Sequence, residues 1–157
     1  METLTHIGLD TQQSEKIIEQ LNKLLSNVQI LYMNVRGNHW NIKGAEFFMF
    51  HEKFEELYND LAEKADEIAE RILMLNGRPV HTFSKYLKVA EIRESENVSL
   101  MHDCVMEILS GLQFLIRKER EILKMASKND DEGTVALMSD YIGSQEKLVW
   151  MYSSILK

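Results

Sequence analysis

The chain has 157 residues, 45% of them hydrophobic and 27% charged, which is the composition of a globular protein rather than a disordered one. Its net charge of -7 argues against holding nucleic acid through the overall field, and no apolar run is long enough to cross a bilayer. Its one cysteine, Cys104, excludes an intrachain disulfide. Because the first residues lack the pattern of a signal peptide, we expect a cytoplasmic protein with a single domain over residues 1–157.

Apolar residues recur at intervals of three and four along most of the chain, which is the spacing of one face of an α-helix. Glu119 and Gln145 interrupt this apolar face in the third and fourth periodic segments. Asn76-Gly77, followed by the only proline at position 79, is a helix-stop signal. The pattern predicts four helices, at roughly 11–39, 45–75, 98–127 and 132–155.

The connection between the second and third predicted helices, residues 76–97, is longer than a tight turn requires. A crossover of this length is typical of bundles in which the second and third helices run parallel. Residues 84–90 have the composition of a short helix within it. The sequence therefore predicts an all-α fold, a four-helix bundle with one long crossover that contains a short helix.

Two of the five histidines lie among other potential metal ligands. His39 is at the end of the first predicted helix, and His51 is early in the second. A chain reversal near residues 41–44 would bring the two imidazoles to similar heights on neighbouring helices. We therefore expect His39 and His51 to be able to contact one metal ion.

The second predicted helix also carries carboxylates on the face of His51. His51 and Glu55 are four residues apart, as are Asp66 and Glu70, so the members of each pair share a face. The fifteen residues from His51 to Asp66 correspond to about 22 Å along the axis, whereas a metal–ligand bond is about 2 Å long. Either the two pairs are unrelated, or an antiparallel second chain brings its carboxylates to the histidines, twice in a two-fold dimer.

The candidate ligands follow the apolar stripe by one residue, which is about 100° of rotation and places them on the flank of the bundle. None of the histidines has a glutamate three residues before it, which argues against an intrachain di-iron centre. Two histidines with carboxylates suit Fe(II), and also zinc or manganese. The alternative is a solvated acidic face beside two packing histidines.

Several segments together match one known pattern. They are Asn38-His39-Trp40-Asn41, His51, Tyr58-Asn59-Asp60-Leu61, the run from Asp66 to Ile72, and Glu146-Lys147 with Trp150. Over essentially the whole chain, the sequence resembles the Dps family of miniferritins. The resemblance implies a ferritin-like subunit and a hollow dodecamer built from two-fold dimers.

The resemblance also implies an activity. Members of this family are ferroxidases, oxidoreductases that oxidise Fe(II), preferably with hydrogen peroxide, and store the ferric iron inside the shell, which limits oxidative stress. Carried over by position, His39 and His51 of one subunit and Asp66 and Glu70 of the other form the non-haem iron centre. A bundle that holds zinc or no metal, without a redox role, remains an alternative.

Other positions are open to two interpretations. Glu55 stands where the family often has aspartate, so the position of a second iron is open. Trp40 matches an aromatic residue beside the centre, which is either a sink for oxidising equivalents or a packing residue. Acidic residues near the start of the last helix line entry pores in the family, but they also suit a helix N-terminus; they are Asp130, Asp131, Glu132 and Asp140.

Binding to DNA is expected to be weak or absent. Some members of the family use a lysine-rich tail, but residues 1–13 contain no Lys or Arg, and Lys157 lies just past the last predicted helix. The net charge of -7 also weakens binding to the negatively charged DNA backbone. The rival hypothesis is a nucleoid-compacting DNA-binding protein without a significant ferroxidase role.

Overall fold

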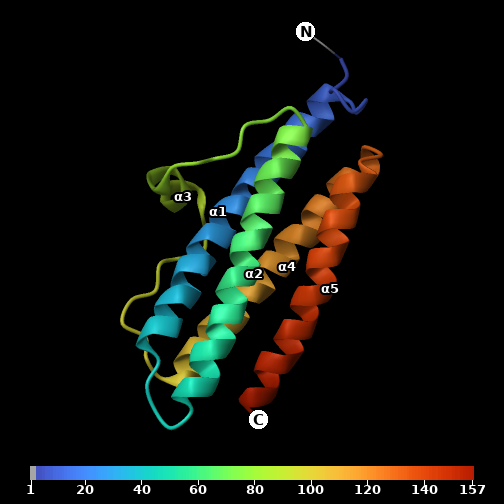
Figure 1. Ribbon diagram of the computed structural model, residues 1–157. Coiled ribbons are helices and arrows are strands. Elements are labelled where there is room, and N and C mark those ends of the chain that lie inside the picture. Colours follow the sequence, from blue (N-terminus) through green and yellow to red (C-terminus); the bar gives the residue numbers. More distant parts are fainter. Residues whose placement is uncertain (1–2) are drawn as a thin grey trace.

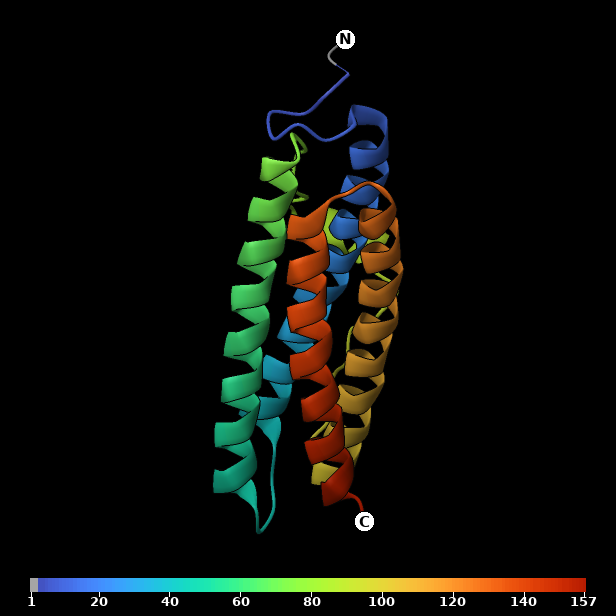
Figure 2. The ribbon, with the colours of Figure 1, turned by 90° about the vertical axis from the view of Figure 1, so that its right-hand side faces the viewer.

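Four long helices lie side by side and form a bundle (Figures 1 and 2). The computed structural model describes residues 3–157, and within this range the regular structure is entirely helical. The predicted all-α bundle is therefore confirmed. Its elements are α1 (Thr11–Asn41), α2 (Phe47–Met74), the short α3 (Phe83–Val89), α4 (Met101–Lys128) and α5 (Glu132–Ile155).

The bundle consists of two antiparallel hairpins joined by the long crossover. Residues 42–46 close the α1–α2 hairpin, and residues 129–131 close the α4–α5 hairpin. Residues 75–100, with α3, run back beside α1, so that α2 and α4 point in the same direction (Figure 1). This connection is what allows the chain to return to the end of the bundle at which the first hairpin closes.

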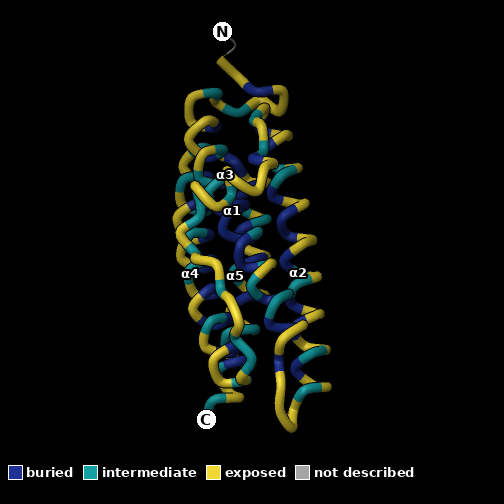
Figure 3. The backbone as a smooth tube through the Cα atoms, turned by 90° about the vertical axis from the view of Figure 1, so that its left-hand side faces the viewer, coloured by how far each residue is buried: buried dark blue, intermediate teal, exposed yellow. Residues whose placement is uncertain are grey.

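The core lies along the bundle axis, because each of the four long helices turns its apolar stripe inward (Figure 3). Burial of each large side chain contributes roughly 1.5–3 kcal/mol, which is what holds the helices together. Within residues 3–157, no helix is apolar over a stretch long enough to cross a membrane. The largest fully buried side chains are Tyr141, Phe50, Phe54, Ile17, Leu21, Leu24, Leu25, Leu31, Leu61, Ile68, Ile72 and Leu75.

Three asparagines of α1 hold the crossover against the bundle. The side-chain amide of each makes hydrogen bonds to backbone groups that have no helical partner, which meets the requirement of those groups for partners. The contacts join Asn22 to Arg78 and Val80, Asn27 to Glu91 and Ile92, and Asn34 to Arg93 and Ser95. The irregular segment is therefore fixed by polar contacts as well as by its apolar ones.

The helix bounds differ by a few residues from those predicted, with a local reason at α4. This helix begins at Met101 rather than at residue 98, because Leu100 is extended, with φ -91° and ψ 136°. The backbone N–H of Lys43 donates to the carbonyl oxygen of Ser99 at 2.9 Å, which holds the preceding residues against the first hairpin. In α3, Thr82 caps the helix through the N–H of Lys85, and the helix begins one residue earlier than predicted.

Candidate metal centre

The α1–α2 hairpin brings His39 and His51 into face-to-face contact. Their ring centroids are 3.8 Å apart and the ring planes differ by 13°. His39 is buried, whereas His51 is partly exposed. The reversal expected near residues 41–44 therefore places the two imidazoles at the same height, on adjacent helices.

Each histidine is held by the backbone of the other. Nδ1 of His39 lies 2.5 Å from the carbonyl oxygen of His51, and Nδ1 of His51 lies 2.7 Å from the carbonyl oxygen of His39. A carbonyl oxygen only accepts, so each Nδ1 carries the proton and donates it. In the neutral ring, Nε2 is then the unprotonated nitrogen, which is the form that binds a metal ion.

Aromatic neighbours hold the outer sides of the histidine pair. Phe47 stacks on His51, with centroids 4.8 Å apart and planes at 22°. Tyr58 meets His39 edge to face, at 5.3 Å and 70°. The two imidazoles therefore have little freedom to rotate away from each other, and a metal ion would bind a pair of nitrogens that is already oriented.

A polar and aromatic cluster adjoins this pair on the surface. The hydroxyl of Tyr58 donates to the exposed carboxylate of Glu55 at 3.5 Å, and burial together with this carboxylate raises the pKa of Tyr58. The guanidinium carbon of Arg36 lies 5.7 Å from the centroid of Tyr58 and 4.9 Å from that of Trp40. Trp40 is 56% exposed, so it belongs to this cluster through Arg36 and is not a core residue.

The two carboxylates Asp66 and Glu70 lie far from the histidines of the same chain. Both are exposed on α2, toward the opposite end of the bundle from the closure of the first hairpin (Figures 1 and 2). The rise of α2 separates His51 and Asp66 by about 22 Å. Within residues 3–157, no three His, Cys, Asp or Glu side chains come together as a metal site.

The four acids near the start of α5 that were expected as pore candidates differ in burial. Asp131 is buried and caps α5 by accepting from the N–H of Thr134 at 3.1 Å. Its other contact is the guanidinium of Arg71, at 2.6 Å, and Arg71 also donates to the hydroxyl of Thr134 at 3.0 Å. Asp131 therefore has a structural position, whereas the acids that remain exposed are Asp130, Glu132 and Asp140.

Comparisons with known proteins agree with this architecture. The ferritin-like domain family matches residues 18–157. The DNA protection during starvation protein of Porphyromonas gingivalis is 47% identical over 147 residues, which are 94% of this chain and 92% of the relative. A crystal structure of a Dps protein from Vibrio cholerae has a TM-score of 0.99 and 52% identity, and the match covers 100% of this chain and 99% of that one. The chain belongs to the Dps family of ferritin-like proteins.

Other Dps structures are also similar. A Dps protein from Bacillus brevis has a TM-score of 0.90 at 30% identity, and the match covers 93% of this chain and 98% of that one. The Vibrio cholerae protein is described as a member of a broad superfamily of ferritin-like diiron-carboxylate proteins. The predicted ferritin-like fold and the Dps resemblance are thus confirmed.

The donor set of this Dps-family chain fits an iron ion on chemical grounds. The imidazoles offer borderline nitrogen donors, and Glu55, Asp66 and Glu70 offer hard oxygen donors. Sets of this kind bind Fe(II), and the anionic oxygens favour the more highly charged Fe(III). The chain by itself presents the nitrogen half and the oxygen half at different places.

Sequence reasoning did not find the residues that hold these ligands. Phe47 is four residues before His51, and that helical spacing is the signal that places both on one face. Arg71 directly follows Glu70, but its partner Asp131 is sixty positions away in the sequence. Nothing local in the sequence identifies such a long-range pair.

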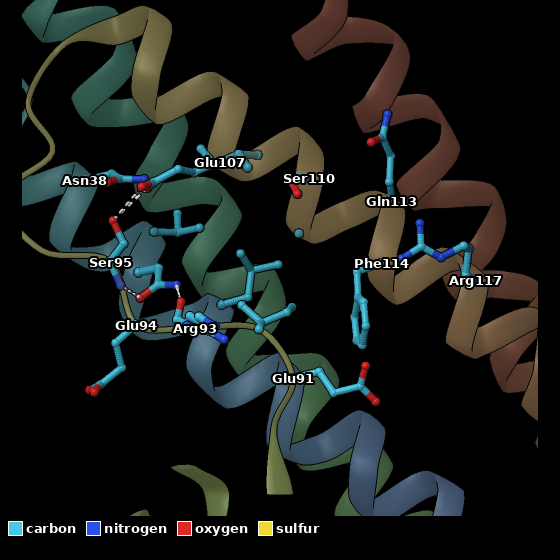
Figure 4. A pocket seen from close by; sticks show the side chains of 16 residues that line it. Asn38, Glu91, Arg93, Glu94, Ser95, Glu107, Ser110, Gln113, Phe114 and Arg117 are labelled. Carbon is cyan, nitrogen blue, oxygen red and sulfur yellow. Dashed lines mark hydrogen bonds between the residues drawn. The ribbon is translucent and has the colours of Figure 1, made fainter. Parts of the chain in front are cut away.

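A cavity of about 510 Å³ lies elsewhere on this Dps-family subunit (Figure 4). It is formed by α1, the crossover and α4, and its lining includes Asn38, Arg93 and Glu107. Ser95 donates to the Glu107 carboxylate at 2.8 Å inside it. None of the candidate metal ligands lines this cavity, so it is separate from the histidine pair.

Proposed function

We propose that the chain is the subunit of a ferroxidase that binds Fe(II), oxidises it with hydrogen peroxide and stores the ferric product inside a hollow dodecamer. The observation that carries this proposal is the reciprocal bonding of His39 and His51. It fixes both tautomers and leaves two adjacent Nε2 atoms as metal ligands. A pair of packing histidines has no need of such an arrangement.

Each iron centre is completed by a second copy of the chain. Because about 22 Å of helix separates His51 from Asp66, the carboxylates must come from a partner whose α2 runs antiparallel. A two-fold axis then pairs the histidines of each subunit with Asp66 and Glu70 of the other, which gives two equal centres per dimer. The exposure of both carboxylates in the single chain supports this arrangement.

In the proposed reaction, iron is the substrate and the protein positions it. Two Fe(II) ions lose one electron each, and one hydrogen peroxide molecule takes both electrons and two protons to become two water molecules. The histidines hold Fe(II), while the carboxylates stabilise the additional positive charge of Fe(III). Glu55, beside the histidine pair, is the candidate ligand for a second ion, and Trp40 is the candidate residue for absorbing stray oxidising equivalents.

Iron enters through acid-lined pores and is stored on carboxylates of the inner wall. Of the four acids near the start of α5, we assign this role to the exposed Asp130, Glu132 and Asp140, and not to the buried Asp131. Such acids attract cations. The expected compartment is the cytoplasm, where consumption of iron and peroxide together limits oxidative stress.

The second candidate function, compaction of DNA, has less support. Some relatives are named DNA protection during starvation protein. The net charge of -7 opposes binding to phosphates through counterion release. A mobility shift at physiological salt is expected to show no stable complex, and a tight complex would overturn this part of the proposal.

Substitution of the histidines tests the ferroxidase directly. Fe(II) is added anaerobically to the native assembly, peroxide follows, and ferric absorbance is recorded for the wild type, His51→Ala and His39→Ala. We expect each substitution to slow the rapid phase at least about a hundredfold, since it removes a ligand. His81→Ala, at an exposed histidine elsewhere, is the matched control.

Two results would contradict the proposal. One is an unchanged rate in His51→Ala. The other is a native mass of 18.3 kDa, that of one chain, because neither half of the ligand set would then be completed.

A further inference from the structure

A layer of polar side chains crosses the interior of the bundle, away from the histidine pair. Glu119 of α4 and Gln145 of α5 are both 0% exposed. Within residues 3–157, neither the carboxylate oxygens of Glu119 nor the amide atoms of Gln145 have a hydrogen-bond partner that meets ordinary geometry. Buried polar groups without hydrogen-bond partners cost free energy, so we expect a further group in this layer to supply those partners.

The charged residue that can supply the missing hydrogen-bond partners is Lys64 of α2. It is only 5% exposed, and its ammonium donates to Asp60 at 2.6 Å. Burial raises the pKa of Glu119, whereas Gln145 and then Lys64 lower it, so the ammonium lies within electrostatic range of this carboxyl. An ammonium has three N–H donors, and Asp60 takes one of them. Within the described residues the other two make no direct bond to Glu119 or Gln145, and one water molecule that bridges the gap would join the ammonium to both.

Tyr141 of α5 connects the layer to α2. The Lys64 ammonium lies 5.2 Å from the centroid of its ring, and its hydroxyl donates to Glu67 at 3.0 Å. Burial raises the pKa of Tyr141, and the Glu67 and Glu119 carboxylates act in the same direction. Side chains of three helices thus meet at one level of the interior: Glu119 from α4, Gln145 and Tyr141 from α5, and the Lys64 ammonium from α2. Ferritin-like bundles build intrachain metal centres in the same part of the fold, from side chains on facing helices.

We infer that this layer has the form of an intrachain metal site in which the positive charge is supplied by the protein itself. The Lys64 ammonium occupies the place that a metal ion would take. A buried ammonium repels a divalent ion, and the same oxygens cannot serve both. Lys64 therefore acts as a specificity residue that keeps metal ions out of the bundle and confines them to the centre shared between subunits. The inference rests on the proposed function for the centre shared between subunits and for Fe(II) as the excluded ion.

Terbium(III) is a suitable probe, because it prefers oxygen ligands and its luminescence is sensitised by a nearby tyrosine such as Tyr141. The titration is made on the assembled protein in the His51→Ala background, which disables the shared centre. Addition of Lys64→Glu is expected to create a new saturable site with one terbium per chain. Addition of Glu119→Gln to that variant is expected to weaken the new site at least tenfold.

Lys53→Glu is the matched control, because Lys53 is on the same helix with its side chain 57% exposed and undergoes the same change of charge. It should create no site that depends on Glu119. If Lys64→Glu fails to fold by circular dichroism, Lys64→Met keeps the stem and removes the ammonium. Terbium should then raise the melting temperature of Lys64→Met, and not that of Lys64→Met with Glu119→Gln.

Three results would overturn the inference. They are the absence of a new site in a folded Lys64→Glu variant, a new site that Glu119→Gln leaves intact, and terbium binding in His51→Ala alone that Glu119→Gln abolishes. The last would mean that the lysine does not close the layer. None of them bears on peroxide-driven oxidation at the shared centre, so failure here is distinct from failure of the ferroxidase proposal.

Discussion

The two ends of α2 carry the two halves of the proposed centre, and they are held in different ways. At the first end, His51 is fixed by a backbone carbonyl and by stacked rings on both faces. At the other end, Asp66 and Glu70 are exposed, and the contacts with α5 are made by their neighbours Glu67 and Arg71. The nitrogen donors are therefore oriented before a metal arrives, whereas the oxygen donors are free to adjust.

This difference follows from the chemistry of the donors. An imidazole binds a metal along one lone pair, so its orientation must be set by the bond at its other nitrogen. A carboxylate has two oxygens and several lone pairs, and it tolerates a range of positions. In the proposed centre, the nitrogen half thus needs rigidity, whereas the oxygen half needs only to be brought close by the second copy of the chain.

Removal of the anchor at the carboxylate end should have the largest effect on stability. Asp131→Ala leaves the Arg71 guanidinium, whose side chain is 14% exposed, without its partner and removes the cap of α5. We expect a loss of about 3–5 kcal/mol, the usual cost of breaking a buried ion pair. Chemical denaturation at one fixed protein concentration measures it, because the proposed assembly would add a stability that depends on concentration.

Glu132→Ala is the control for that substitution, since Glu132 is exposed in the first turn of the same helix. It should cost less than about 1 kcal/mol, through the helix dipole alone. Equal losses in the two variants would contradict the anchoring role of Asp131.

The buried polar layer between α2, α4 and α5 offers a third setting, in which stability depends on pH through Glu119 of α4. Burial raises the pKa of Glu119 from 4.5 to about 8, although Gln145, Lys64 and Arg120 lower it. Between these values the folded state binds more protons than the unfolded state, so stability falls as pH rises from about 4.5 to 8. Glu119→Gln should remove this slope, with a gain on the order of 1–3 kcal/mol at pH 8 relative to the wild type.

Melting temperatures recorded over this pH range test the expectation. Glu121→Gln, at an exposed glutamate two residues further along α4, is the control and should keep the slope of the wild type. If Glu119→Gln melts with the same pH dependence as the wild type, Glu119 is not the group responsible.

Loosening the histidine end should have a smaller effect, and one on binding rather than folding. Phe47→Ala removes the ring stacked on His51 and leaves the ligand itself in place. We expect about tenfold weaker binding of Co(II), a spectroscopic substitute for Fe(II), as is typical when the support of a ligand is lost. Phe48→Ala is the control, because Phe48 is 83% exposed, and equal affinity losses in both would contradict the role of the stack.

The smallest expected effect concerns Glu55, which stands beside the histidine pair. Glu55→Gln removes a charge that raises the pKa of Tyr58, so this pKa should fall toward its ordinary value in an ultraviolet titration. Binding of a second iron per centre should weaken about threefold, as expected for one exposed carboxylate. Glu55→Asp keeps the charge and should retain the second iron. Retention of that iron in Glu55→Gln, or its loss in Glu55→Asp, would contradict a role that depends on the charge alone.

The helices and the closeness of the histidines could be predicted from the sequence, because both follow from local spacing. Helical periodicity fixes which residues share a face, and a short hairpin brings His39 to His51. The hydrogen bonds between each Nδ1 and the opposite carbonyl oxygen could not be predicted, since they depend on how residues 42–46 close the hairpin. The pairing of Arg71 with Asp131 depends on tertiary packing in the same way.

The interruptions at Glu119 and Gln145 were visible in the sequence, but their meaning was not. A polar residue in an apolar stripe indicates either a surface position or a buried polar site, and periodicity does not distinguish the two. Both residues are fully buried here, so the stripes continue inward through them. Which other side chains meet them is decided by the packing of three helices.

The asparagines of α1 have a consequence for the order in which the protein forms. Contacts between the two histidines span twelve residues, and such local contacts form rapidly during folding. Those of Asn22, Asn27 and Asn34 with the crossover span 56 to 65 residues and form only when the chain has returned along α1. A nascent chain can therefore form the α1–α2 hairpin with its histidine pair first, and the contacts of the crossover fix the far side of α1 only afterwards.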